Sequence, residues 1–458
     1  MAILTFNEGT ILIECEKGEG TEWDFLSDFA VFDERVNLWR AHACKYEQLM
    51  RTCYAKGLIP VDHAKDYLEF TNPLKTDFQL LPHQRKALSS WVGHKCRGVV
   101  VLPTGSGKTF LALNAISIVK RSALVVVPTI DLLYQWVSIL ERSFSCEVGM
   151  LGGGSNILKT ITVSTYDSAV LRMPFLGNKF GLLIYDECHH LTGDIYRTSA
   201  LLSLAPYRLG LTATFPEEQV PCEVITNLIG PVVHKIGIRD LQGGVLSDYR
   251  TERIALQLTP EEKIEYEKCH EEYVSFVRRN HVSFQSDNGW KDFLLACAVR
   301  PDGKNAYQAY LKQRNIARCG RMKLLETWRI IQSNPHARII VFTADNATAY
   351  QIGNLLCLPV LTHKTKAAER KDFLERFRSG EYPVLVTGKV LNEGVDVPEA
   401  NIAIVVSGSG CVREHIQRLG RILRRGENKE AVLYELVSDG TSEMGISNRR
   451  RNNEAYDG

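Results

Sequence analysis

The chain has 458 residues, which is too long for a single hydrophobic core and predicts about three domains. Hydrophobic residues make up 45% of the chain and charged residues 24%, values close to globular averages that argue against a disordered or membrane-embedded class. The formal net charge of +2 is too small to hold nucleic acid by bulk electrostatics, so any such binding requires local basic patches.

Two absences in the sequence bear on the cell compartment. No apolar run reaches the ~18 residues that a membrane span needs, and the N-terminus lacks the basic-then-apolar layout of a signal peptide. The 12 cysteines are scattered singly, without any Cys-x-x-Cys spacing, which favours free thiols over a zinc site or a disulfide framework. We therefore expect an intracellular protein with no membrane partner.

Residues 1–70 have the pattern of a small α+β domain. Apolar residues over 2–14 flank the turn sequence Asn7-Glu8-Gly9-Thr10, which predicts a β-hairpin. Over 34–56 apolar residues recur at helical spacing, and Gly57 follows where a C-terminal cap belongs, so we predict one helix there. Nothing in this segment carries recognisable chemistry.

From residue 78 onward, short apolar strands alternate with amphipathic helices, and the same alternation returns after a break. Such alternation predicts an α/β fold with parallel sheets covered by helices on both faces and ligands at the carboxyl ends of the strands. We place these two domains at 71–240 and 241–458. The expected strands span 98–102, 123–127, 160–164, 182–185 and 208–211 in the first, and 339–343, 384–387, 402–407 and 431–437 in the second.

The first of these strands leads into a glycine-rich loop. Residues 98–102 are an apolar run, and 110–120 predict a helix, so backbone N–H groups of the loop and the helix N-terminus would face a bound phosphate. Lys108 would reach the β- and γ-phosphates, and the Thr109 hydroxyl would ligate Mg²⁺. The loop residues assigned to nucleotide binding are Thr104, Gly105, Ser106, Gly107, Lys108 and Thr109.

This match to a phosphate-binding loop is partial. The full consensus has Gly at the position of Leu102, and an ordinary strand-turn-helix is the alternative reading. The strand before the loop and the helix after it supply the context that the motif requires.

A second strong signal is an apolar strand that ends in two carboxylates, Asp186 and Glu187. In a sheet of this kind the end of that strand lies beside the phosphate loop, so Asp186 can hold Mg²⁺ and Glu187 can orient or deprotonate the attacking water. The alternative is a strand capped by surface acids.

The break at 241–325 differs in kind. Thr259-Pro260-Glu261-Glu262 supplies a capping Thr, a Pro at the first helical position and a Glu three residues after the cap, so a helical insertion begins there. Its basic residues, including Arg278, Arg279 and Arg314, are interleaved with aromatic residues. That mixture suits a nucleic-acid backbone, although a solvated helical face is the commoner meaning of such charges.

Taken together, Leu102 to Thr109, Asp186-Glu187-Cys188-His189, Thr212-Ala213-Thr214 and Gln417-Arg418-Leu419-Gly420-Arg421-Ile422-Leu423-Arg424 resemble the motifs of superfamily 2 helicases and translocases. More closely, the chain resembles the XPB family of DNA helicases in its compact archaeal form. The resemblance implies two RecA-like motor domains, a DNA-sensing, damage-recognition-like domain at 1–70 and a thumb-like helical element at about 259–320.

The resemblance also implies roles for further residues of the nucleotide site. Gln84 matches a glutamine that reads adenine, which favours ATP; an exposed glutamine on a helix is the alternative. Gly394 and Asp396 match a motif linking nucleotide state to DNA. Arg421 and Arg424 match arginines that stabilise charge on the transferred phosphoryl group. Three further residues match motifs that couple ATP hydrolysis to movement of the motor domains: Thr212, Thr214 and Gln417.

Four threonines at the ends of predicted strands match positions where hydroxyls and adjacent backbone N–H groups hold phosphates of one DNA strand. They are Thr129, Thr165, Thr343 and Thr387. A turn or a helix cap is the usual role of such a threonine, so we assign these residues as a group. The chain departs from the family after Thr-Ala-Thr-Phe, where Pro216-Glu217-Glu218-Gln219 replaces an Arg-Glu-Asp triplet associated with strand separation.

The resemblance therefore implies a DNA-dependent ATPase and helicase of 3′ to 5′ polarity, active in DNA repair or transcription. The cofactors that the resemblance implies are ATP and Mg²⁺, and the partners that it implies are a DNA fork or damaged duplex and a nuclease. The expected location is the cytoplasm of an archaeal cell, or the nucleus of a eukaryotic one. Two alternatives stay open: an RNA-stimulated ATPase, because most contacts go to phosphate, and a nucleotide-gated scaffold that binds nucleic acid without translocation.

Overall fold

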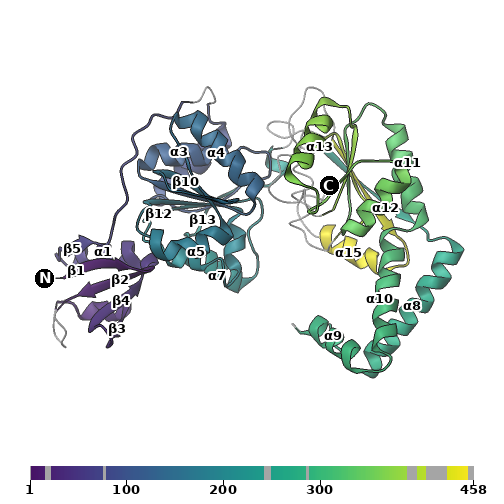
Figure 1. The fold of residues 1–458 in the computed structure, drawn as a ribbon, viewed down its shortest axis with the longest axis horizontal. Helices are drawn as coiled ribbons and strands as arrows, with labels where there is room; N and C mark the ends of the chain where they lie inside the picture. The colour runs from purple at the N-terminus through teal and green to yellow at the C-terminus, as the bar shows by residue number, and fades with distance from the viewer. Residues whose placement is uncertain are drawn as a thin grey trace. The chain divides into compact units, whose positions relative to one another are not determined.

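The computed structural model describes residues 2–15, 22–75, 79–241, 249–284, 288–388, 400–408 and 431–451. The chain divides into two compact units, with the division between Asp240 and Leu241 (Figure 1). A short 3₁₀ helix, η4 (Arg239–Leu241), spans that division. Among the described residues, every helix is too short or too polar to cross a membrane.

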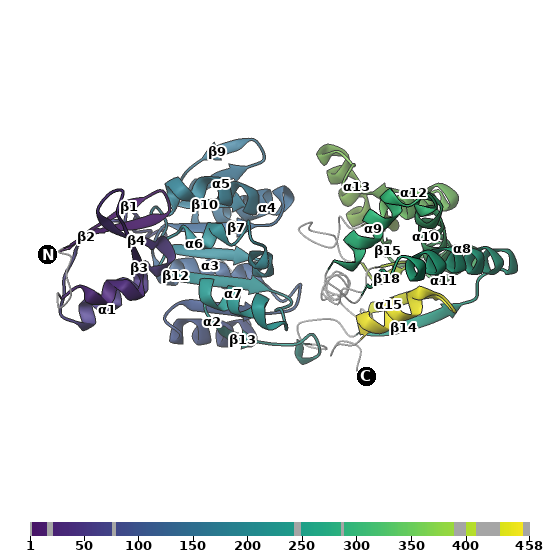
Figure 2. The same cartoon turned by 90° about the horizontal axis from the view of Figure 1, so that it is seen from below.

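The first unit begins with a five-stranded sheet in the order β3-β4-β2-β1-β5. The predicted hairpin is confirmed, because β1 (Ile3–Asn7) and β2 (Thr10–Glu14) pair antiparallel. Figure 2 shows α1 beside these strands. The other elements of this small domain are η1 (Asp24–Asp28), β3 (Ala30–Asp33), β4 (Leu38–His42), η2 (Ala43–Lys45), α1 (Tyr46–Ala55) and β5 (Val61–His63).

The single helix predicted over 34–56 is wrong in its first half. Residues 38–42 form β4, which pairs antiparallel with both β2 and β3. Trp39 packs edge-on against Phe32 of β3, with ring centroids 5.5 Å apart. Such cross-strand pairing overrides the helical spacing of the apolar residues. Gly57 does follow the helix with a φ of 74°, as predicted.

The next sheet has eight strands in the order β13-β6-β12-β11-β7-β10-β8-β9. All five strands predicted for it are present and parallel, within one or two residues at each end. The strands are β6 (Arg97–Val101), β7 (Ala123–Val127), β8 (Gly149–Gly152), β9 (Ser155–Ile157), β10 (Ile161–Thr165), β11 (Leu182–Asp186), β12 (Tyr207–Thr212) and β13 (Val232–Lys235).

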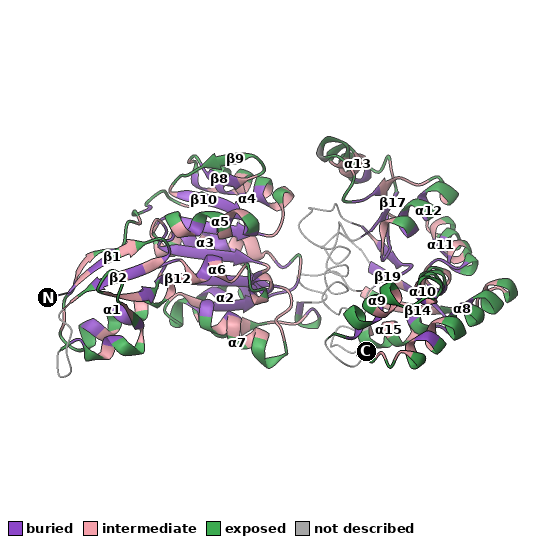
Figure 3. Ribbon diagram, turned by 60° about the horizontal axis from the view of Figure 1, so that its bottom comes forward, coloured by how far each residue is buried: buried purple, intermediate pink, exposed green. Residues whose placement is uncertain are grey.

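Helices cover both faces of this sheet, as Figure 1 shows for α3 and α4 on one side and α5 and α7 on the other. The inner strands are buried, as Figure 3 shows for β10 and β12, whereas the edge strands β9 and β13 are partly exposed. Alternate side chains of β6, β7 and β11 enter two separate apolar clusters. The helices are α2 (Pro82–Gly93), α3 (Lys108–Val119), α4 (Ile130–Phe144), α5 (Tyr166–Leu176), η3 (Cys188–Thr192), α6 (Thr198–Leu201) and α7 (Gln219–Leu228).

The N-terminal domain packs directly against the eight-stranded domain. Leu204 belongs to the apolar core of the N-terminal domain, and Asn178 Nδ2 donates to Ala64 O at 3.0 Å. Arg97 at the start of β6 lies 3.7 Å from the Glu47 carboxylate of α1. These contacts fix the small domain on the end of the sheet opposite to the carboxyl ends of its strands.

The second unit contains a six-stranded parallel sheet in the order β14-β19-β18-β15-β17-β16. The four strands predicted for it are confirmed. A further strand, β14, was not predicted; it precedes the helical insertion and pairs along its whole length with β19. The elements are β14 (Tyr249–Leu256), α11 (Arg321–Ser333), β15 (Ile339–Phe342), α12 (Asn346–Leu356), β16 (Val360–Leu361), α13 (Ala367–Ser379), β17 (Val384–Thr387), β18 (Ile402–Val405), β19 (Ala431–Ser438) and α15 (Ser442–Arg451).

A helical insertion extends from the second unit between β14 and α11. It comprises α8 (Pro260–Arg279), α9 (Gly289–Val299) and α10 (Gly303–Arg318), with α8 and α10 side by side (Figure 1). The predicted capping box is present: Thr259 Oγ1 accepts from Glu262 N at 3.3 Å, and Glu262 Oε2 accepts from Thr259 N at 3.1 Å.

Candidate nucleotide site and nucleic-acid contacts

The glycine-rich loop connects β6 to α3, as its sequence predicted. Gly107 caps α3 with a φ of 84°, a left-handed conformation that favours glycine. A Cβ atom at Gly107 would lie 2.2 Å from Gln84 Nε2, so any larger residue would displace that amide. The loop can therefore approach its neighbours closely, and its N–H groups precede a helix N-terminus suited to an anion.

Lys108 lies between this loop and the two carboxylates at the end of β11. Its Nζ donates to Leu102 O at 3.2 Å and lies 4.0 Å from Glu187 Oε1, and its side chain is 12% exposed. Thr104 Oγ1 is buried and has no hydrogen-bond partner among the described residues. A buried hydroxyl without a partner is costly, and a phosphate oxygen at the loop would satisfy it.

Two side chains from α2 contact the main chain of the glycine-rich loop. Gln84 is only 4% exposed, so the alternative of an exposed glutamine is wrong. Its Nε2 donates to Ser106 O at 2.9 Å, and its Oε1 accepts from Leu81 N at 2.8 Å. His83 Nε2 lies 3.0 Å from the same Ser106 O. The structure brings Gln84 to the loop, and its reading of adenine stays a prediction.

Asp186 ends β11 with both carboxylate oxygens engaged. Its Oδ2 accepts from Trp136 Nε1 at 3.0 Å, and its Oδ1 accepts from the Glu187 N–H at 3.1 Å. Burial raises the pKa of Asp186, as does the neighbouring charge of Glu187, and the Lys108 ammonium partly offsets both effects. The alternative of surface acids is wrong for Asp186, which is 9% exposed.

The backbone of the acidic pair is held by Tyr166, the first residue of α5. Its hydroxyl lies 3.0 Å from Asp186 O and 3.3 Å from Glu187 O. Burial raises the pKa of Tyr166 far above its ordinary value, so the hydroxyl stays protonated and remains a donor. Glu187 itself has a φ of 50°, which is strained for a residue other than glycine.

Glu187 is connected to the Thr-Ala-Thr motif at the end of β12. Its Oε2 lies 3.5 Å from His189 Nδ1 and 3.4 Å from Thr212 Oγ1. Thr212 Oγ1 in turn lies 3.0 Å from His189 Nδ1, 2.8 Å from Thr214 O and 3.2 Å from Thr214 N. The structure thus brings the predicted coupling residue Thr212 into contact with Glu187, and Thr214 into contact with Thr212. Their coupling role stays a prediction.

The oxygen donors at this site suit Mg²⁺ shared with a nucleotide. Asp186 and Thr109 provide hard oxygen ligands, and Mg²⁺ commonly takes one or two protein ligands and completes its shell with phosphate oxygens and water. The described ranges contain no group of three or more His, Cys, Asp or Glu residues that could hold a metal alone. A cation here would therefore depend on bound phosphate.

Five assigned residues cannot be placed. Gly394, Asp396, Gln417, Arg421 and Arg424 lie outside the described residues. Their roles stay predictions.

The four threonines assigned to nucleic acid all have partners within the protein. Thr129 and Thr165 cap α4 and α5 by accepting from Leu132 N and Ser168 N, respectively. The other two are completely buried. Thr343 Oγ1 donates to Asp345 O at 2.9 Å, and Thr387 Oγ1 donates to Gly388 O at 3.3 Å. The alternative role of cap or turn is therefore present, and contact with phosphates stays a prediction.

The basic residues of the insertion are differently engaged. Arg278 is exposed, whereas Arg279 Nη2 lies 2.7 Å from Asp302 Oδ2, and the Arg314 guanidinium lies 5.8 Å from the centroid of the Tyr310 ring. The aromatic residues pack mainly on one another around the buried Phe293. Phe276 and Phe293 thus form the core of the insertion, whereas Phe284 and Trp290 remain 45% and 42% exposed.

The loop that departs from the family pattern leads into α7. Glu217 and Glu218 are exposed, and Glu218 occupies the N-cap position of α7 without a side-chain capping bond. An arginine at this loop would face solvent as these glutamates do.

Sequence reasoning missed three residues that shape the site: His83, Trp136 and Tyr166. His83 precedes Gln84 and Tyr166 follows Thr165, so their positions next to assigned residues could have indicated that they lie at the site. Trp136 is far in sequence from the loop and the acidic pair, and its helical spacing with Leu133 and Leu140 indicated only a core position.

Three family descriptions match parts of the chain. "Xeroderma pigmentosum group B helicase damage recognition domain" matches residues 4–64. "Type III restriction enzyme, res subunit" matches residues 77–217. "ERCC3/RAD25/XPB C-terminal helicase" matches residues 308–455.

Known proteins are similar over most of the chain. A "DNA 3'-5' translocase XPB2" of Sulfurisphaera tokodaii is 38% identical over 452 residues, which cover 98% of this chain and 100% of the relative. A "DNA 3'-5' helicase XPB" of Mycobacterium tuberculosis is 28% identical over 79% of this chain and 61% of its own length. The crystal structure of the Pyrococcus furiosus Hef helicase domain covers 82% of this chain and 100% of its own, with a TM-score of 0.55 and 18% identity, and so supports the fold alone.

Proposed function

Because the chain belongs to the XPB helicase family, we propose that it is an ATP-dependent DNA helicase or translocase that moves 3′ to 5′ and acts in DNA repair or transcription. One observation carries the enzymatic part of this proposal. The Lys108 ammonium lies 4.0 Å from the Glu187 carboxylate, so a phosphate-binding loop and an acidic pair share one site. That arrangement suits hydrolysis of a nucleoside triphosphate.

Each residue of the described site has a proposed role. Backbone N–H groups of residues 104–109 bind the phosphates of ATP, and Lys108 stabilises charge on the transferred phosphoryl group. Thr109 and Asp186 hold Mg²⁺, which neutralises phosphate charge when bound. Glu187 accepts a proton from the attacking water, and His189 and Thr212 fix its carboxylate.

We also propose the division of the chain into domains: residues 1–70 as the DNA-sensing domain, 71–240 as the first motor domain, and 241–458 as the second with its thumb-like insertion. The family matches to residues 4–64, 77–217 and 308–455 support this division. A DNA fork or damaged duplex is the proposed substrate, and a nuclease is a proposed partner protein.

The test is ATP hydrolysis measured with no nucleic acid, single-stranded DNA, duplex DNA, forked DNA and RNA. Stimulation by DNA above that by RNA supports the proposal, and a strand-displacement assay then separates unwinding from translocation alone. Greater stimulation by RNA would favour an RNA-dependent enzyme. Binding of nucleic acid without any stimulated hydrolysis would favour a nucleotide-gated scaffold.

A further prediction concerns the insertion. If Arg278 neutralises a DNA phosphate, we expect Arg278→Ala to weaken binding equally for all DNA sequences. We also expect the negative slope of log affinity against log salt to become shallower by about 0.9. Arg279 pairs with Asp302, so we expect a smaller change for Arg279→Ala. Fluorescence anisotropy of labelled duplex at several salt concentrations measures both slopes.

Lys263→Ala is the matched control, because Lys263 is an exposed cation near the other end of α8. We expect it to leave the slope unchanged. If Arg278→Ala and the unmodified protein showed the same slope of log affinity against log salt, Arg278 would belong to a solvated helical face that does not contact DNA.

A further inference from the structure

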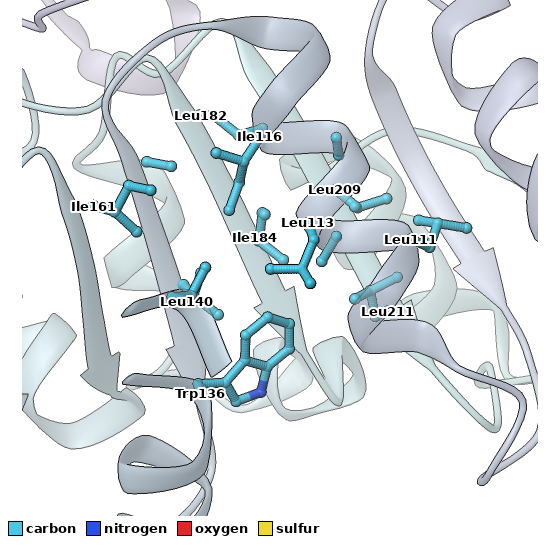
Figure 4. Close-up of a cluster of buried hydrophobic side chains, with 14 of the residues drawn as sticks. Leu111, Leu113, Ile116, Trp136, Leu140, Ile161, Leu182, Ile184, Leu209 and Leu211 are labelled. Carbon is cyan, nitrogen blue, oxygen red and sulfur yellow. The ribbon is translucent and has the colours of Figure 1, made fainter. Parts of the chain in front are cut away.

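The carboxylate of Asp186 is oriented by a side chain from another helix. Trp136 lies on α4 and is 2% exposed, and its indole N–H points at Asp186 Oδ2. Figure 4 shows the indole nitrogen turned away from the apolar side chains that surround the ring. Because the indole N–H can only donate, it holds one carboxylate oxygen of Asp186 toward α4.

The same helix begins at an assigned DNA contact. Thr129 caps α4, and Trp136 lies about 10 Å further along the helix axis, at roughly 1.5 Å per residue. Between them α4 packs on the sheet through Leu133. A displacement at its first turn therefore moves the indole as well.

Trp136 differs in this respect from Tyr166, the other side chain that holds the acidic pair. Tyr166 contacts main-chain carbonyls, so it fixes the backbone, whereas Trp136 contacts the carboxylate itself. The Trp136 bond measures 3.0 Å, and such a bond is largely lost by 3.6 Å. A shift of about half an ångström in α4 is thus enough to release the carboxylate.

We propose that Trp136 is a positioning residue that couples DNA bound at the start of α4 to the Mg²⁺-binding carboxylate of Asp186. This inference rests on the proposed function, because it requires DNA at Thr129 and a Mg²⁺-nucleotide at the loop. Coupling between two ligands is reciprocal, so the Mg²⁺-nucleotide must alter DNA affinity by the same factor by which DNA alters Mg²⁺-nucleotide affinity.

The test is the affinity for labelled duplex DNA in the presence of a non-hydrolysable ATP analogue, measured with Mg²⁺ and with EDTA. The ratio of the two affinities is the Mg²⁺-dependent coupling, which we expect to be about fivefold or more in the unmodified protein. In Trp136→Phe, which keeps an aromatic ring and removes the N–H, we expect a ratio near one. We expect its DNA affinity in EDTA to be unchanged.

Trp91→Phe is the matched control. Trp91 is completely buried on α2, and its Nε1 donates to a main-chain acceptor, Arg208 O, at 3.0 Å. The Trp91→Phe variant therefore loses an equivalent buried hydrogen bond in the same domain, and we expect it to keep the Mg²⁺-dependent coupling of the unmodified protein. Should Trp136→Phe fail to fold, benzothienylalanine at position 136 replaces only the N–H by sulfur and preserves the ring shape.

Equal coupling in the Trp136 and Trp91 variants would overturn the inference and leave Trp136 as a packing residue. A ratio of one in the unmodified protein, together with DNA-stimulated ATP hydrolysis, would also overturn it while leaving the proposed function intact. Absence of both DNA binding and DNA-stimulated hydrolysis would overturn the proposed function itself.

Discussion

ATP hydrolysis by Lys108→Ala is expected to fall by about a thousandfold or more, with and without DNA. The Lys108 ammonium lies 4.0 Å from Glu187 Oε1, at the end of the phosphate-binding loop, where it can stabilise negative charge on the transferred phosphoryl group. Its loss removes an interaction that strengthens in the transition state, so the turnover number falls more than the ATP affinity. Steady-state phosphate release measures this.

Lys86→Ala is a suitable control, because Lys86 is an exposed lysine on α2 of the same domain. We expect full activity in that variant. Thermal unfolding of both variants separates loss of catalysis from loss of folding, since the Lys108 ammonium also donates to Leu102 O. A correctly folded Lys108→Ala protein that still turns over ATP at the unmodified rate would remove Lys108 from the site.

The parallel sheets could be predicted from the sequence because their strands are continuous apolar runs. Residues 123–127 and 182–186 are buried along their whole length, as a strand covered on both faces requires. The position of Asp186 at the end of β11 followed from the same run. The sequence alone therefore predicts that the loop and the acidic pair lie at one edge of the sheet.

The strands that sequence reasoning missed depend on partners far away in the chain. β14 carries the charged residues Arg250, Glu252 and Arg253, so it does not read as a buried strand, yet it pairs with β19 at the edge of the second sheet. Its half-buried side chains are those of an edge strand. Likewise β4 is a strand because β2 and β3 flank it, which local spacing does not reveal.

Contacts within the site were hidden for the same reason. The strand order places β11 beside β7, and α4 follows β7 directly, so Trp136 reaches Asp186 across neighbouring strands. Periodicity assigns such a tryptophan to the core, and only the order of the strands shows which polar atom its N–H meets. Similarly, Gln84 and His83 contact Ser106 O only because α2 packs beside the loop.

Glu187→Gln is expected to reduce ATP turnover by about a hundredfold to ten-thousandfold while ATP binding is kept. The glutamine has the same shape, and its amide can still approach His189 Nδ1 and Thr212 Oγ1, which lie 3.5 and 3.4 Å from Glu187 Oε2. It cannot accept a proton from water. Hydrolysis assays and titration with a fluorescent ATP analogue measure the two effects separately.

The direction in which Glu187→Gln changes the ATP affinity can also be predicted. Removing one negative charge beside Lys108 leaves the site more favourable to the phosphates, so we expect Glu187→Gln to bind ATP at least as tightly as the unmodified protein. Glu141→Gln removes the same charge from an exposed position on α4 and should change neither quantity. If Glu187→Gln weakened ATP binding and turnover by equal factors, Glu187 would be holding the nucleotide in its ground state, and the base would have to be sought elsewhere.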